Sequence, residues 1–235
     1  DHGHVFVGAS VPYGMVQLGP TNIRTGWDWV SGYHYTDSTI FGFSHTHLSG
    51  TGIGDLLDIL VMPTTGNPKL AKGEDTPTAA NQEVGYGTGM YSLFNRDTEV
   101  TKAGYYAVHL DRYDVDAELT TTERVGLHRY TFPKATDAAI VFNLADALNW
   151  DKTMEGYIIQ ESENTISGYR HSKGWANNQK LFFTAEFSKP MKGIELYDGE
   201  TLIEGTELNS PKIYTRILFD TEDKEQILVK VALSP

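Results

Sequence analysis

Apolar and polar side chains alternate along most of this chain, and this period of two constrains the fold more than any other feature. From Val115 to Thr121, Val, Ala and Leu alternate with Asp, Glu and Thr. Successive side chains of a strand point to opposite faces, so the pattern predicts a strand with one buried face. Further segments alternate in the same way or are rich in aromatic and β-branched residues: Tyr105 to Leu110, Val125 to Phe132, Leu181 to Phe187, Ile213 to Phe219 and Ile227 to Leu233.

One apolar run and the turn residues between the strands also indicate the fold. Ala138 to Phe142 is apolar throughout, which predicts a strand covered on both faces. Turn residues separate the strands, and no long segment has helical amphipathicity, although one short helix is expected within residues 143–152. Residues 63–90, rich in Gly, Pro, Thr and Asn, are expected to form an exposed excursion. We therefore predict an all-β chain, a large antiparallel β-sandwich or barrel with little helix, in which residues 1–235 form a single domain.

The composition narrows the classes of partner. Acidic residues (31) outnumber basic ones (19), and the formal net charge is -12. This charge argues against a nucleic-acid backbone or an anionic membrane surface as the natural partner, and no run is long and apolar enough to span a bilayer. The chain contains no cysteine, which excludes disulfides and thiolate chemistry. It begins at Asp1 without Met, so its start is expected to have been trimmed by processing or by design, and any signal peptide is not visible.

The segment from Gly26 to Gly54 is unusually dense in residues that bind ligands. It contains two Trp, three His and six Gly. Indole rings are flat apolar bodies with a polar edge, and glycine lets the backbone turn sharply or approach a partner closely. Such a combination suits a protein that holds a sugar ring or locks onto a neighbouring domain.

Trp27 and Trp29 flank Asp28 within this segment. If the segment is extended, the two indoles share one face and Asp28 points the other way. One interpretation stacks Trp27 on a sugar ring while a neighbouring polar group orients the hydroxyls. The alternative buries the indoles in the core. The sequence leaves both interpretations open.

His45 and His47 would also share a face of an extended chain. Two imidazoles so placed can bind a divalent metal, with Asp55 or Asp58 as a further ligand. The alternative is that they form local hydrogen bonds or support an interface. No third ligand stands at a recognisable spacing, so we predict no metal site.

Catalytic groups are not identifiable from the residues alone. Residues 50–54 are rich in glycine but lack the Lys-Ser/Thr of a phosphate-binding loop, and no nucleophile elbow surrounds a serine. Glycoside hydrolysis needs two carboxyl groups across the scissile bond. Several carboxylates are available, but nothing in the sequence places two of them opposite each other: Asp28, Asp37, Asp55, Asp58, Asp146, Asp151 and Glu155.

Eight segments together cover most of the chain and resemble the N-terminal part of glycoside hydrolase family 92, the calcium-dependent exo-acting α-mannosidases. They are HGHVFVGASVPYGMVQLGP (2–20), GWDWVSGYHY (26–35), GFSHTHLSGTG (42–52), GDLLDILVMP (54–63), AGYYAVHL (103–110), AELTTTERVGLHRYTFP (117–133), SGYRHSKGWA (167–176) and FFTAEFSKP (182–190).

The resemblance implies an N-terminal β-sandwich that packs against a larger C-terminal (α/α) barrel domain, and an inverting hydrolysis of α-mannosides such as those of N-glycans. It places the catalytic acid, the base and the calcium ligands in the C-terminal domain. We therefore assign no catalytic residue and no metal ligand here, and we expect this chain to be a fragment of a longer two-domain enzyme, inactive alone. Secretion or a bacterial periplasmic location is implied too, and an exposed docking surface is expected to promote self-association.

A supporting role carries over to the GWD segment, which helps to form the site beside the cleaved mannose. Trp27 is the best match for the sugar contact, with Asp28 beside it and Trp29 as second choice. His34, His45 and His47 are expected to support the pocket or the domain interface. Two rival functions remain, a small His-based metalloenzyme and a stand-alone carbohydrate-binding module that uses a platform of Trp27, Trp29, Tyr33 and Tyr35.

Overall fold

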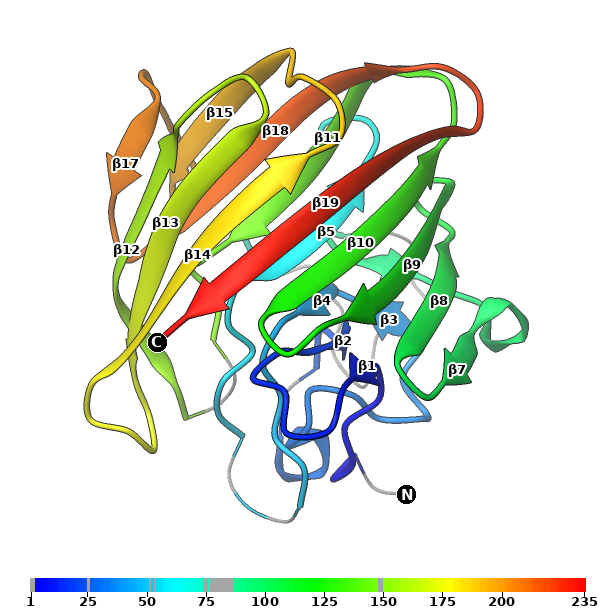
Figure 1. Cartoon of the computed structure of the whole chain (residues 1–235), viewed down its shortest axis with the longest axis vertical. Helices are drawn as coiled ribbons and strands as arrows, with labels where there is room; N and C mark the ends of the chain where they lie inside the picture. The colour runs from blue at the N-terminus through cyan, green and yellow to red at the C-terminus, as the bar shows by residue number, and fades with distance from the viewer. Residues whose placement is uncertain are drawn as a thin grey trace.

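The computed structural model describes residues 3–24, 26–50, 52, 54–73, 76, 87–147 and 150–235, and two large antiparallel sheets dominate it (Figure 1). The first sheet has the order β1 (Ala9–Ser10), β2 (Gln17–Thr21), β4 (Gly42–Ser44), β5 (Leu60–Thr64), β11 (Ala135–Asn143), β18 (Ile213–Thr221), β15 (Gly193–Asp198) and β16 (Thr201–Ile203). The second has the order β17 (Glu207–Asn209), β12 (Lys152–Gln160), β13 (Thr165–Lys173), β14 (Gln179–Phe187), β19 (Glu225–Ser234), β10 (Val125–Phe132), β9 (Val115–Thr121), β8 (Tyr105–Leu110) and β7 (Val100–Lys102).

The remaining described elements are small. Strands β3 (Thr39–Ile40) and β6 (Ser92–Leu93) form a separate pair, and two single-turn 3-10 helices are present, η1 (Trp27–Trp29) and η2 (Arg96–Thr98). The prediction of an all-β sandwich with little helix is confirmed. Each long strand that alternation predicted is present, and β8, β9 and β10 have the predicted bounds.

The core lies between the two sheets. In β14, Leu181, Phe183, Ala185 and Phe187 are buried and alternate with partly or fully exposed residues, as the period of two predicts. Aromatic contacts join the sheets: Phe142 of β11 stacks on Phe183 with ring centroids 5.7 Å apart, and Phe187 contacts Phe219 of β18. Full burial of such a side chain contributes on the order of 1.5–3 kcal/mol, so these rings account for much of the adhesion between the sheets.

Two local predictions need correction. No described residue of 143–152 is helical, because Asn143 ends β11 and its Oδ1 accepts hydrogen bonds from the backbone of Ala145 and Asp146, a turn rather than a helix start; residues 148–149 lie outside the described part. The segment 63–90 is not simply an exposed excursion, because its two ends are buried in β5 and at Met90. Residues 74, 75 and 77–86 of it lie outside the described part.

Loops gather at one end of the sandwich. In Figure 1 the blue and cyan connections of the N-terminal part lie at the lower end, where the yellow β13–β14 connection also lies. This end carries the Gly26–Gly54 segment that the sequence singled out, and the candidate site is built there.

Candidate functional site

The GWDW segment is a tight turn and not an extended chain. Residues Trp27–Trp29 form η1, in which successive side chains point about 120° apart, because a 3-10 helix has three residues per turn. The prediction that both indoles share one face is therefore wrong. Trp27 is 61% exposed, whereas Trp29 is partly buried and stacks on His34 with ring centroids 4.6 Å apart. The turn thus separates the two interpretations that the sequence left open, since one indole faces solvent and the other packs inward.

The N-terminal segment fixes this turn from outside. The carbonyl of Gly3 accepts a hydrogen bond from the Ser31 amide at 3.0 Å, and the His4 ring lies 3.3 Å from the carbonyl oxygen of Trp27. Gly3 has φ +70°, and a Cβ there would lie 1.7 Å from the carbonyl oxygen of Asp28. Only glycine fits so close to the turn. Trp27 and the exposed Asp28 are therefore presented by a backbone held in place on both sides.

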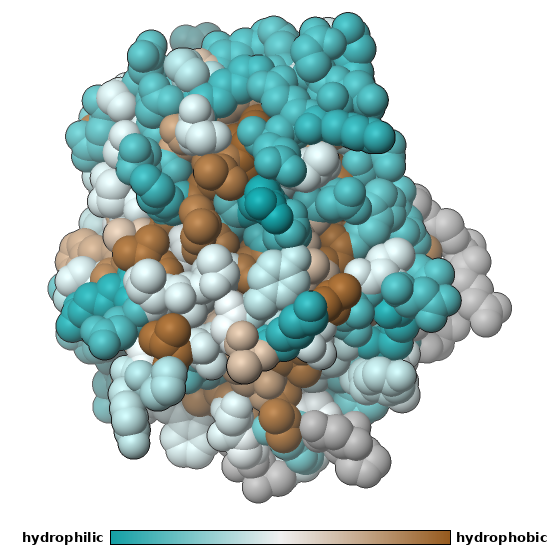
Figure 2. All heavy atoms as spheres, turned by 45° about the vertical axis from the view of Figure 1, so that its right-hand side comes forward, coloured by the Kyte–Doolittle hydropathy of each residue, from teal (hydrophilic) through white to brown (hydrophobic). Residues whose placement is uncertain are grey.

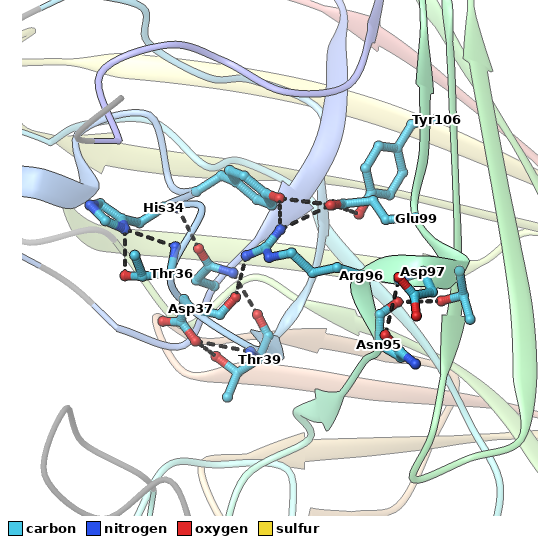
Figure 3. A network of polar contacts seen from close by, with 12 residues as sticks. His34, Thr36, Asp37, Thr39, Asn95, Arg96, Asp97, Glu99 and Tyr106 are labelled. Carbon is cyan, nitrogen blue, oxygen red and sulfur yellow. Dashed lines mark hydrogen bonds and ion pairs between the residues drawn. The ribbon is translucent and has the colours of Figure 1, made fainter.

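A polar network anchors the loop that follows the turn (Figure 3). Glu99 accepts hydrogen bonds from the hydroxyls of Tyr33 and Tyr106 at 2.9 and 2.8 Å, and it pairs with Arg96 at 2.9 Å. The guanidinium of Arg96 also donates to the backbone carbonyl of Asp37 at 2.7 Å. Burial, and then the charge of Glu99, raise the pKa of both tyrosines, so the phenols stay protonated and act as donors.

This network affects the four aromatic rings that a carbohydrate-binding module would use as its platform. Tyr33 is only 5% exposed and is committed to Glu99, whereas Tyr35 is 64% exposed and lies over the Arg96 guanidinium at 4.2 Å. With Trp29 also turned inward, the four rings do not form one platform. The structure therefore disfavours the stand-alone module in the form the sequence suggested.

His34 supports the turn directly. Its backbone amide donates to Asn22 Oδ1 at 2.6 Å, and its ring Nδ1 accepts from the backbone and the hydroxyl of Thr36 at 3.2 and 2.8 Å. The Nδ1 atom is therefore the acceptor of the ring, and the imidazole face stacks on Trp29. His34 therefore orders the loop beside the turn, and its role in supporting a pocket or a domain interface stays a prediction.

His45 belongs to a buried chain of hydrogen bonds that crosses the sandwich. We call this chain of His45, His128 and Tyr130 the relay. Its Nδ1 lies 2.7 Å from the carbonyl of Ile59, its Nε2 lies 3.0 Å from Nε2 of His128 on β10, and Nδ1 of His128 lies 2.7 Å from the Tyr130 hydroxyl. A carbonyl only accepts, so the proton of neutral His45 sits on Nδ1. Tyr130 then donates to His128, and His128 donates to His45. Gly126 makes room for the ring, because a Cβ there would lie 2.8 Å from His45 Cδ2.

The ring of His47 is likewise occupied by hydrogen-bond partners. Its Nδ1 donates to the carbonyl of Gln17 at 2.7 Å, and its Nε2 faces the Thr21 hydroxyl at 3.4 Å. Burial lowers the pKa of His45 and of His47 to about 4, so both rings are neutral near pH 7. Every ring nitrogen of the pair faces a protein partner. The geometry does not suit metal ligation, and among the described residues no group of three or more His, Asp or Glu side chains could hold a metal ion.

The carboxylates near these histidines form buried ion pairs that stabilise the fold, and they do not form a reaction centre. Arg170 of β13 pairs with Asp58 at 2.5 Å and with Asp151 at 2.7 Å, and all three side chains are at most 1% exposed. Thr46 and Gln179 donate further hydrogen bonds to Asp58. Burial raises the pKa of Asp151, and the guanidinium of Arg170 opposes that shift. The triad joins the loop before β5 to the second sheet.

The backbone beside Asp58 is strained. Leu56, Leu57 and Ile59 all have positive φ, at 72°, 66° and 51°. Each such residue costs about 1–2 kcal/mol when it carries a Cβ. The hydrogen bonds of Asp58 to Arg170 and of the Ile59 carbonyl to His45 hold the segment in this conformation. Strain of this kind marks a place where the fold maintains a particular loop geometry.

Trp175 is a site residue that sequence reasoning missed. It lies in the β13–β14 connection, its side chain is 64% exposed, and its backbone amide donates to Asp55 Oδ2 at 2.6 Å. It lines a pocket of about 340 Å³ at the same end of the sandwich as the GWDW turn. The sequence did contain one signal, since Trp175 stands in the SKGWA segment next to a glycine, as Trp27 does.

The comparisons identify the family. Residues 1–234 match the model of the glycosyl hydrolase family 92 N-terminal domain, so the chain belongs to this family. A solved α-mannosidase of family GH92, BT3965 from Bacteroides thetaiotaomicron, is 34% identical with a TM-score of 0.91, and 100% of this chain covers 31% of that one. The GH92 glycosyl hydrolase ccman5 is 26% identical with a TM-score of 0.81. The inverting mannosidase BT2199 of the same bacterium, 24% identical, shares the fold with a TM-score of 0.77.

One curated relative is described as a secreted protein. The protein called an uncharacterized secreted glycosidase of Arthroderma benhamiae is 30% identical over 135 residues, which are 56% of this chain and 16% of that protein. The chain therefore spans less than a third of the length of these relatives. No helix among the described residues is long and apolar enough to cross a membrane.

Proposed function

We propose that this chain is the β-sandwich half of a two-domain, calcium-dependent exo-α-mannosidase, and that the GWDW turn forms one wall of its active-site pocket. The observation that carries the proposal is Trp27, an indole 61% exposed on a turn that Gly3, His4 and the Glu99 network hold in place. Membership of the family and the α-mannosidase relatives support it, one of which is a complex with mannoimidazole.

The chemistry is assigned to the other domain. Inversion needs one carboxyl group as general acid and a second as general base for water. Asp58 and Asp151 are buried against Arg170 and are in no position to serve. Calcium takes six to eight oxygen ligands, and those carboxylates already bind a guanidinium. As the resemblance to the family implies, the (α/α) barrel domain supplies the acid, the base and the calcium site, where the ion would help to bind and polarise the sugar.

The role of this chain is then to shape the pocket. The flat face of the Trp27 indole contacts the apolar face of the sugar beside the cleaved mannose, and Asp28 next to it accepts hydrogen bonds from hydroxyls. A rigid wall of this kind orients the sugar and excludes water around the reacting bond. The substrates are α-mannosides of glycans, including N-glycans, and the enzyme acts after secretion or in a bacterial periplasm.

The Trp27→Ala variant of the longer gene product tests the wall. We expect kcat/KM for an α-mannoside to fall about 10- to 100-fold, because each loss of about 1.4 kcal/mol of transition-state stabilisation costs a factor of ten. Leu202→Ala is the matched control, since this side chain is 58% exposed on the edge strand β16. An unchanged kcat/KM in Trp27→Ala would refute the proposed wall.

A further inference from the structure

Trp175 and the loop before β5 enclose a pocket separate from the Trp27 side chain. The pocket has a volume of about 340 Å³, which lies within the usual range for small-molecule sites. The indole forms one wall, the loop of Ser49 and Gly50 forms another, and Asp55 and Gln179 supply polar atoms. The face of an aromatic ring next to hydroxyl, amide and carboxylate groups is the chemistry that recognises a pyranose, whose ring has an apolar face and a rim of hydroxyls.

The indole is presented rigidly. Asp55 is 3% exposed, and its two oxygens accept hydrogen bonds from the amides of Leu56 and Trp175 at 2.7 and 2.6 Å. Gly174 allows this approach, because a Cβ there would lie 2.7 Å from the carboxylate oxygens. Each carboxylate oxygen retains a second lone pair for a ligand hydroxyl. A buried carboxylate therefore sets the position of an exposed indole, and it lines the same pocket.

The pocket is joined to the GWDW turn by short contacts. Val30, directly after η1, lines it. His4, whose ring meets the Trp27 carbonyl, accepts a hydrogen bond from the Gly50 amide at 2.6 Å, and the Phe6 amide donates to the Ser49 hydroxyl at 3.1 Å. The N-terminal segment that contacts the Trp27 turn thus also contacts the loop at the rim of the pocket. Both indoles are therefore positioned by the same segment.

We propose that the Trp175 pocket binds a second mannose ring of the substrate, in addition to the ring that Trp27 contacts. The identity of this sugar rests on the proposed function. Trp175 stacks on the apolar face of the ring, while Asp55 and Ser49 exchange hydrogen bonds with its hydroxyls. Because these groups all belong to this chain, the pocket binds the sugar without the catalytic domain.

The test is an NMR titration of the 235-residue chain with methyl α-mannopyranoside. We expect saturable shifts of the Trp175 indole resonance and of the amides of Gly50 and Asp55, with Trp150, which is 52% exposed and does not line the pocket, unmoved. Trp175→Ala should weaken binding at least 10-fold as read from the Gly50 and Asp55 amides, Trp175→Phe less, and Trp150→Ala not at all. Trp27→Ala should leave the shifts in place.

Contrary results separate the two proposals. Absence of saturable shifts at the solubility limit of the sugar, or equal binding by Trp175→Ala, would overturn the pocket and leave the Trp27 wall standing. Binding of the mannoside here, together with unchanged mannosidase activity of Trp27→Ala in the longer gene product, would support the pocket and remove the wall.

Discussion

Replacing Arg170 by methionine is expected to lower the free energy of unfolding by about 3–5 kcal/mol, a large share of the roughly 5–15 kcal/mol that stabilises an ordinary domain. The substitution keeps the apolar stem but removes the guanidinium from between Asp58 and Asp151, and all three side chains are at most 1% exposed. Two carboxylates then remain buried without a counter-charge. The strained segment at Leu56 loses its anchor as well. Urea unfolding followed by circular dichroism measures the change.

Arg129 offers the matched control for Arg170. It forms a bidentate pair with Glu118 at 2.6 and 2.5 Å, but its side chain is 45% exposed. Exposed ion pairs contribute up to about 1 kcal/mol, so Arg129→Met should cost little. Adding Asp58→Asn and Asp151→Asn to Arg170→Met should recover part of the loss. Equal losses in Arg170→Met and Arg129→Met would show that burial does not set the strength of the triad.

Acidification is expected to destabilise the sandwich steeply between about pH 6.5 and pH 4. Burial lowers the pKa of His45 and His47 from 6.5 to about 4, and burial and the neighbouring His45 lower the pKa of His128 further. In this window the unfolded chain binds protons that the folded chain does not, so stability falls as the pH falls. Each histidine contributes a slope of up to about 1.4 kcal/mol per pH unit. Stability is fully retained above the unfolded pKa.

The contact between His45 and His128 explains why protonation destabilises the folded chain. A proton on His45 would sit on Nε2 and place two N–H groups against each other at the 3.0 Å contact of His45 and His128. Urea midpoints from pH 7 to pH 4.5 should therefore fall, and His128→Gln should reduce the slope by about one proton. His109, whose side chain is 31% exposed and lies outside the relay, is the site of the control substitution His109→Gln. Histidine NMR signals of the folded chain that titrate near pH 6.5 for His45 would contradict this account.

The sequence predicted the long strands well and the loop end poorly, for a physical reason. In β14 and β19 one face meets the core and the other meets solvent, so alternation reports the strand directly. Apart from the local β1–β2 pair, the short strands up to β6 pair with segments far away in the chain, and they show no such period. The sequence does not predict the turn at Trp27, because the residue that packs closely against it, Gly3, lies far away in the chain.

Long-range partners explain the rest of what the sequence did not reveal. The sequence did not reveal the partner of His45, which is His128, 83 residues away. The same holds for Asp58 and Arg170, 112 residues apart, and for Asp55 and Trp175, 120 residues apart. Spacing along the chain carries no information on such pairs. The roles of Trp27, Asp28 and Trp29 in sugar binding stay predictions.

We propose that this chain shapes a mannosidase pocket whose chemistry lies in another domain. The direct measurement is mannose release from an α-mannoside by the 235-residue chain and by the longer gene product, each with calcium and with a chelator. We predict calcium-dependent release by the longer product and none by the 235-residue chain at equal concentration. Calcium-dependent release by the 235-residue chain alone would contradict the account.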